Sequence, residues 1–253
     1  PDMVELDAEV YWSAAKSVIH AVLRATHLPP SAIAAVGVTS QGETLIVTDR
    51  NGRPLRPAIV WLDNRSREEA EALSARFPLD TIYRLTGQQE MAPTWTATRL
   101  LWLRAHEPAV FARAARFLLP ADFLLFKLTG RFATHPGLNP STLYFDLTRR
   151  AWWPDMLDAL GIDADRLPDL LEPFEPAGRL RAAAAADTGL PAGIPVCGAP
   201  IDQVAGAVGA GNLDAGLVTE TTGAALALAA TLDQPLYDPQ KRAGLYLHAL
   251  PNR

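Results

Sequence analysis

Short apolar runs alternate with amphipathic helical stretches along this chain, and this alternation restricts the fold more than any other feature. Runs rich in β-branched and small apolar residues predict strands over 33–38, 44–48, 58–62, 194–198, 217–222 and 225–229. Apolar residues at helical spacing predict helices over 10–23, 65–77, 152–160, 181–187 and 202–210, with several more between 93 and 130. Asn51-Gly52 supplies a tight hairpin turn. The pattern predicts an α/β fold with a mixed sheet flanked by helices.

Charge and hydropathy exclude several function classes. The 23 Lys+Arg and 28 Asp+Glu give a net charge of -5, which argues against a nucleic-acid-binding surface. The best apolar stretch, 117–126, is interrupted by Pro120 and Asp122, and no run reaches the roughly 18 residues of a membrane helix. The single cysteine, Cys197, allows no internal disulfide and fits a reducing, cytoplasmic location. We expect it to be a buried, inert thiol.

Several familiar catalytic motifs are absent. The chain contains no G-x-x-x-x-G-K-[ST] phosphate loop, no G-x-G-x-x-G after a strand and no G-x-S-x-G nucleophile turn. Its five histidines are scattered, and no pair has metal-ligand spacing. Candidate chemistry is therefore sought in polar loops at strand ends, where α/β sheets bind ligands.

The first candidate loop is Ser40-Gln41-Gly42-Glu43, which follows a predicted strand. Gln41 and Glu43 can hydrogen-bond hydroxyl groups, and Gly42 lets a ligand approach the backbone. The alternative is an ordinary polar loop. The second candidate, 61–65, places Trp61 beside an Asp and an Arg, a combination suited to the C–H faces and hydroxyls of a sugar.

In the second loop the alternative is a half-buried Trp61, with Asp63 capping a helix that starts at Arg65. The third candidate, 198–203, is a strand–loop–helix junction with Asp202 near a helix N-terminus. The helix dipole there favours an ionised carboxylate that can accept a proton or hold a cation. A simple helix cap is again the alternative.

Taken in order, these pieces resemble the FGGY family of carbohydrate kinases. The matching segments are 36–44, 52–65, 122–130, 189–196 and 198–211. The resemblance implies two ribonuclease-H-like lobes, as in actin and hexokinase, with the active site between them. It identifies residues 1–211 as the substrate-binding lobe, lacking its first hairpin, and 212–253 as the start of a nucleotide-binding lobe. We therefore expect this piece alone to be inactive.

The same resemblance implies phosphorylation of a sugar or polyol hydroxyl, with ATP and Mg²⁺ as cofactors. Asp202 matches the catalytic base and would also face the metal indirectly. The implied substrate contacts are Gln41, Gly42, Glu43, Trp61, Thr94 and Gln203. Gly42 stands where glycerol kinase has arginine, and the Met-His typical of xylulokinases after Gln41 is absent. These departures favour a pentulose, a hexulose or a longer polyol.

The implied nucleotide-phosphate loop is Thr221-Thr222-Gly223, followed by Ala224 where the family usually has threonine. This substitution leaves open an alternative, a catalytically inactive sugar-binding or sensor protein on the same fold. An actin-like assembly protein fits the 41–43 loop and Trp61 poorly. The expected partners are a sugar or polyol substrate and a second copy in a homodimer, with no nucleic acid and no membrane.

Overall fold

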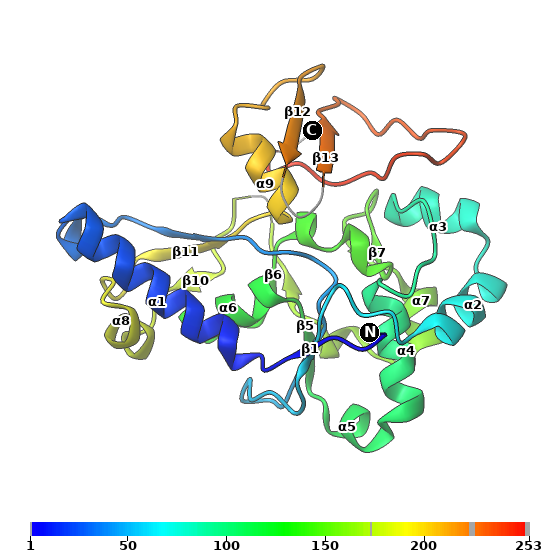
Figure 1. Ribbon diagram of the computed structural model, residues 1–253, viewed down its shortest axis with the longest axis horizontal. Coiled ribbons are helices and arrows are strands. Elements are labelled where there is room, and N and C mark those ends of the chain that lie inside the picture. The colour runs from blue at the N-terminus through cyan, green and yellow to red at the C-terminus, as the bar shows by residue number, and fades with distance from the viewer. Residues whose placement is uncertain (1, 173, 223–225, 251–253) are drawn as a thin grey trace.

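The computed structural model describes residues 2–172, 174–222 and 226–250, and helices alternate with strands along them (Figure 1). The α-helices are α1 (Glu9–Thr26), α2 (Arg67–Arg76), α3 (Leu79–Thr86), α4 (Thr96–His106), α5 (Pro108–Arg113), α6 (Pro120–Thr129), α7 (Pro154–Leu160), α8 (Ala182–Thr188) and α9 (Asp202–Gly209). The strands are β1 (Glu5–Leu6), β2 (Val36–Val38), β3 (Ile46–Thr48), β4 (Ala58–Ile59), β5 (Arg116–Leu118), β6 (Ala133–Thr134), β7 (Phe145–Asp146), β8 (Ala151–Trp152), β9 (Asp169–Leu170), β10 (Gly178–Arg179), β11 (Pro195–Gly198), β12 (Val218–Thr222) and β13 (Leu226–Ala230).

The strands that matter for the site are β2 and β11, which are far apart in sequence and lie side by side. They pair in parallel, with Val36 opposite Val196 and Val38 opposite Gly198. Strand β10 pairs antiparallel with the other edge of β11, so the sheet is mixed, as predicted. Because β2 and β11 run in the same direction, their carboxyl ends meet at one edge. The candidate loops 39–43 and 199–202 both leave from that edge.

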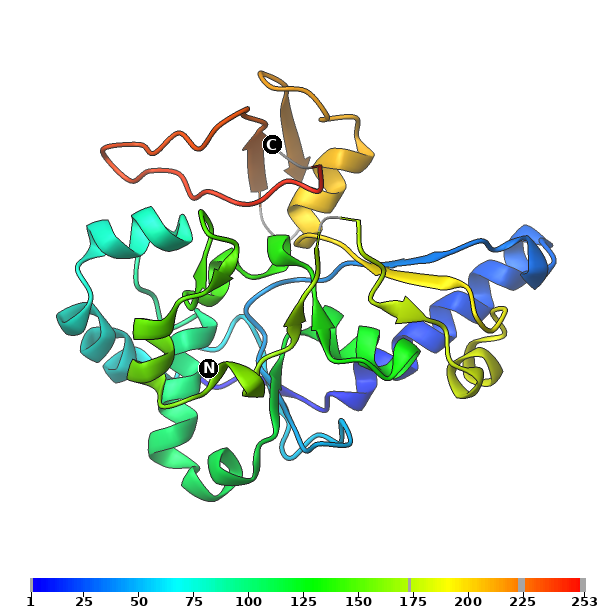
Figure 2. The same cartoon turned by 180° about the vertical axis from the view of Figure 1, so that it is seen from behind.

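Helices pack around these strands. Helix α1 contacts α6 and α8, and α6 contacts β11 and β2 (Figures 1 and 2). Gly189 ends α8 in the left-handed conformation (φ 76°) and donates its N–H to the carbonyl oxygen of Ala185, which is the usual role of a glycine at a helix C-terminus. In the part of the chain that the structure describes, no helix is long and apolar enough to cross a membrane.

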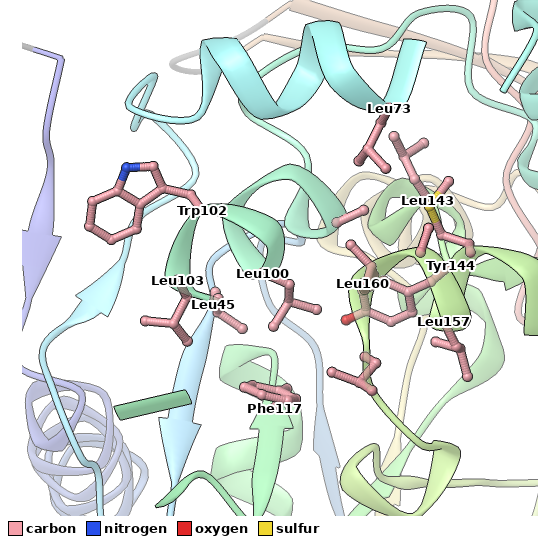
Figure 3. Close-up of a cluster of buried hydrophobic side chains, with 14 of the residues drawn as sticks. Leu45, Leu73, Leu100, Trp102, Leu103, Phe117, Leu143, Tyr144, Leu157 and Leu160 are labelled. Atoms are coloured by element: carbon pink, nitrogen blue, oxygen red, sulfur yellow. The ribbon is translucent and has the colours of Figure 1, made fainter. Parts of the chain in front are cut away.

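A second core surrounds α4, which packs on α2, α5 and α7. Figure 3 shows Leu100 and Leu103 of α4 among buried side chains from α2, α7, β5 and the segment before β7. Leu100 and Leu103 are fully buried. Burial of this kind contributes about 1.5–3 kcal/mol per large apolar side chain. The core fixes α4, and α4 in turn carries a buried arginine toward the candidate site.

Three local predictions need correction. Residues 116–118, within a stretch predicted to be helical, form β5, because tertiary pairing with β3 (Val47 opposite Phe117) outweighs local propensity. The helix expected from Arg65 begins at Arg67, so Asp63 does not cap it. Cys197 is half-buried rather than fully buried. The other predicted helices are confirmed within a few residues at each end. The predicted strands are shorter in the structure, except that β13 has the predicted length and lies one residue later.

Candidate active site

The loops after β2 and β11 are joined directly to each other. The Thr39 hydroxyl donates to the carbonyl oxygen of Pro200 at 2.7 Å, and the Asp202 amide donates to the carbonyl oxygen of Ser40 at 3.0 Å. These two bonds place the first residue of α9 against the loop that contains Glu43. Two of the three candidate loops are therefore one structural unit.

Glu43 occupies a strained turn in that unit. Its φ is 59°, and the Thr44 amide donates to the carbonyl oxygen of Gly42 at 2.6 Å, which closes a γ-turn around Glu43. A non-glycine residue at positive φ costs about 1–3 kcal/mol and persists only when its surroundings impose it. Such strain is concentrated at ligand sites, which supports a functional role for this turn.

Arg99 of α4 supplies much of that constraint. Its guanidinium donates to the carbonyl oxygens of Glu43 (2.6 Å), Trp61 (2.7 Å) and Asp63 (3.0 Å). The residue is fully buried, and burial lowers its pKa to about 10. One side chain thus ties the first candidate loop to the second. The sequence does not reveal this role, because the partners of Arg99 lie 36 to 56 positions away along the chain and α4 contains a second arginine, Arg104.

Asp63 and Arg65 in the second loop form a buried ion pair rather than a ligand site. The Asp63 carboxylate accepts from Arg65 Nε at 2.9 Å and Nη2 at 2.7 Å, and also from the Val4 amide. Burial alone would raise the Asp63 pKa, but these hydrogen bonds outweigh it and lower the pKa. Trp61 is half-buried, and its amide donates to Thr44 Oγ1 at 3.0 Å.

The carboxyl groups of Glu43 and Asp202 lie within electrostatic range of each other. Burial is the main cause of a raised Glu43 pKa, and the negative charge of Asp202 raises it further. The Ser141 hydroxyl and Arg99 act in the opposite direction. Asp202 is exposed, and its Oδ1 accepts from the Gln203 amide at 2.9 Å. The site therefore combines an exposed carboxylate with a half-buried one that holds its proton more readily.

Gln41 links the loop that contains Glu43 to helix α1. Its Nε2 donates to the Tyr11 hydroxyl at 2.8 Å and to Thr44 Oγ1 at 3.1 Å. Because both amide hydrogens have partners, the amide oxygen is the group left for a ligand hydroxyl. Thr44 receives hydrogen bonds from both Gln41 and Trp61, so these two candidate residues share one scaffold.

Most of the chain matches a known protein family. The family model for the N-terminal domain of the FGGY family of carbohydrate kinases matches residues 1–209. The chain belongs to the FGGY family. It is 34% identical over 249 residues to the xylulose kinase of Escherichia coli K12, covering 98% of this chain and 50% of that protein. It is 31% identical over 255 residues to the autoinducer-2 kinase of Yersinia pestis strain Angola, covering 99% of this chain and 47% of the relative.

Solved structures agree with that assignment. The xylulose kinase from Rhodospirillum rubrum superposes with a TM-score of 0.91 at 28% identity, over 100% of this chain and 51% of that one. The Plasmodium falciparum glycerol kinase with ADP gives a TM-score of 0.79 at 25% identity, over 90% of this chain and 46% of that one. The predicted fold, the N-terminal lobe of an actin- or hexokinase-like sugar kinase, is confirmed. The chain spans about half the length of the curated relatives it matches.

The remaining candidates of this FGGY chain lie beside Asp202, in the turn before α4, on β12 or outside the described residues. Gln203 is exposed beside Asp202, and Thr94 is half-buried in the turn that leads to Thr96, whose hydroxyl donates to the Glu43 carbonyl oxygen at 3.2 Å. Thr221 and Thr222 are exposed on β12, and the Thr222 hydroxyl bonds Glu220 Oε1 at 3.1 Å. Gly223 and Ala224 lie outside the described residues.

Gly42 is a position of the FGGY chain where an added side chain would push against buried neighbours. A Cβ there would lie 2.9 Å from Ile201 Cδ1 and 2.9 Å from Ser141 Oγ, both buried. We expect Gly42→Ala to destabilise the protein by about 1–2 kcal/mol through overpacking. Since Ile201 precedes Asp202, we also expect kcat/KM of the full-length protein to fall about 10-fold or more. Thermal unfolding and steady-state kinetics measure the two effects.

The matched control is Gly37→Ala in β2, where a Cβ would meet no atom within 4 Å. This variant should keep both the stability and the kinetics of the wild type. If Gly42→Ala and Gly37→Ala behave alike, close packing at Gly42 does not position the site.

Proposed function

We propose that the protein containing this chain transfers a phosphoryl group from ATP to a hydroxyl of a sugar or polyol, with pentuloses and hexuloses as the first candidates. The observation that carries the proposal is the pair of carboxylates, Glu43 and Asp202, where the loops after β2 and β11 meet. Relatives named xylulose kinase and autoinducer-2 kinase match almost the whole chain, which supports the same chemistry here.

In the proposed mechanism Asp202 is the general base. Its carboxylate is exposed, and its backbone is fixed to Ser40, so it can receive the proton of the attacking hydroxyl. Phosphoryl transfer needs mainly positioning and charge stabilisation, and the proton leaves late, so a weak base suffices. Glu43, held by Arg99, would orient a neighbouring hydroxyl by a hydrogen bond, and Gln41 Oε1 a further one.

The nucleotide side of the proposal rests on fewer residues. Carboxylate oxygens are ligands that Mg²⁺ prefers, so Asp202 and Glu43 would be the residues that help to hold the ion, and the ion would supply positive charge against the phosphates of ATP. Within the described residues, no group of three or more His, Cys, Asp or Glu side chains could hold a metal, so phosphate oxygens and water would supply most ligands. Phosphate contact at Thr222 would require its hydroxyl to leave Glu220.

The division of the chain follows the same proposal. Residues 1–211 would form the sugar-binding lobe, and 212–253 would begin the nucleotide-binding lobe. Helix α9 joins the two parts and packs against β12 and β13. The single Cys197 suits the reducing cytoplasm as the site of this activity.

Ligand-induced stabilisation of the full-length protein tests the proposed substrate class. Xylulose, other pentuloses, hexuloses, gluconate and glycerol are added singly, and the unfolding temperature is recorded. A substrate at 100 times its Kd should stabilise the protein by about 2.7 kcal/mol. We expect a ketose to give the largest shift. If none of these compounds shifts the unfolding temperature, the proposed function is wrong.

A further inference from the structure

The chain after β13 returns to the first part of the molecule and lies along α3. We call residues 237–247 the strap (Figures 1 and 2). The Tyr83 hydroxyl of α3 donates to the carbonyl oxygen of Ala243 at 2.9 Å and accepts from the Asp238 amide at 3.0 Å. The Tyr237 hydroxyl donates to the carbonyl oxygen of Arg84 at 2.8 Å. The far end of the strap is therefore anchored to α3.

A second anchor lies nearer the site, at Gly87. The Leu245 amide donates to the Gly87 carbonyl oxygen at 2.8 Å. Gly87 has φ 76°, and a Cβ on it would lie 2.6 Å from the carbonyl oxygen of Leu245. No other residue fits there without displacing the strap. The backbone of the strap at Leu245 is therefore in direct contact with the backbone at Gly87.

Tyr246 is the next residue after Leu245, and its hydroxyl is held by a buried glutamine, Gln88. Its hydroxyl bonds Gln88 Oε1 at 3.3 Å, and Gln88 Nε2 donates to the Leu245 carbonyl oxygen at 3.4 Å. Gln88 is fully buried, whereas Tyr246 is 38% exposed. Gln88 therefore fixes the phenol hydroxyl by a hydrogen bond, while part of Tyr246 stays exposed.

The strap also meets the loop that leads to Asp202. A Cβ on Gly137 would lie 2.7 Å from Pro200 Cβ and 3.0 Å from the carbonyl oxygen of Leu247, so the residue next to Tyr246 and the residue two before Asp202 lie against the same backbone position.

Burial is the main cause of a raised Tyr246 pKa, and the charges of Glu43 and Asp202 raise it further. The phenol is therefore neutral at physiological pH. Because its hydrogen is directed to Gln88, its oxygen lone pairs remain for a hydroxyl donor.

We propose that Tyr246 is a substrate-contacting residue, which accepts a hydrogen bond from a sugar hydroxyl other than the one that is phosphorylated. The inference rests on the proposed function and adds to it: the sugar site is completed by a residue from the segment after β13. A sugar with several hydroxyls beyond the reacting one can use this contact while Glu43 and Asp202 hold the reacting end.

Titration of the full-length protein with xylulose, without ATP, tests the contact. Tyr246→Phe keeps the ring and removes the hydroxyl, so Kd should rise about 3- to 10-fold, the usual range for one hydrogen bond. The KM for ATP should stay unchanged, and the unfolding temperature should fall no further than in Tyr237→Phe, because each variant removes one hydrogen bond donated by a phenol. These two readouts separate a substrate contact from a structural role. The matched control is Tyr237→Phe, which removes a hydroxyl from the far end of the strap and should leave Kd unchanged.

Three other outcomes are informative. If Tyr246→Phe binds xylulose as tightly as the wild type, the contact is overturned and the proposed function stands. If Tyr246→Phe and Tyr237→Phe weaken binding equally, strap anchoring explains the effect and the direct contact is overturned. If the wild type binds neither xylulose nor any other compound of the panel, the proposed function fails, and the inference fails with it.

Discussion

Replacing Asp202 with asparagine should lower kcat about 100- to 10,000-fold and leave sugar affinity within about 2-fold of wild type. Asparagine keeps the shape of the side chain and its place at the start of α9, but it cannot take up the proton of the attacking hydroxyl. Because Asp202 is exposed, the substitution leaves no buried group unpaired. Steady-state kinetics gives kcat, and calorimetric titration of the same protein gives the affinity for sugar.

The control for this experiment is Asp187→Asn, which changes an exposed carboxylate near the end of α8 in the same way. It should keep wild-type kcat. A wild-type kcat in Asp202→Asn would remove Asp202 from the role of base. A large loss of sugar affinity in that variant would make it a binding residue instead.

Replacing Arg99 with alanine should lower the free energy of unfolding by about 3–5 kcal/mol, the range measured when one partner of a buried charged contact is removed. The reason is that three carbonyl oxygens, those of Glu43, Trp61 and Asp63, lose the guanidinium at once, and the Glu43 oxygen keeps the Thr96 hydroxyl as a donor. Arg99→Lys should fall between alanine and wild type, because one ammonium group cannot reproduce the spread of the guanidinium. Denaturant unfolding followed by circular dichroism measures the change.

Arg113→Ala, at an exposed arginine of α5, is the corresponding surface control, and it should change stability by less than about 0.5 kcal/mol. We also expect Arg99→Ala to raise the KM for sugar, since the strained turn at Glu43 would lose its main support. An Arg99→Ala protein within 1 kcal/mol of wild type would show that the turn does not depend on this arginine.

Structural features that depend on residues close together in the sequence could be predicted from the sequence. The apolar runs before Ser40 and Ala199 are strands, and the polar residues that follow them meet at one sheet edge because parallel strands end together. The helix that starts at Asp202 was predicted from the small apolar residues after it. These are short-range patterns, so a single sequence contains them in full.

Features that depend on distant contacts were not predictable in this way. Arg99 acts on carbonyl oxygens that lie 36 to 56 positions away along the chain. Tyr246 reaches the site only because the strap returns to α3, and nothing around it in sequence indicates a ligand contact. The ion pair of Asp63 with Arg65 looks like a helix cap until the helix is seen to begin at Arg67.

The most direct measurement is the release of ADP by the full-length protein from ATP and Mg²⁺, with and without xylulose or the panel compound that stabilises it most. The release of ADP should depend on the sugar and should be nearly lost in Asp202→Asn. A protein that binds the sugar but releases no more ADP with it than without it would contradict the account, and would be a sugar-binding protein without kinase activity.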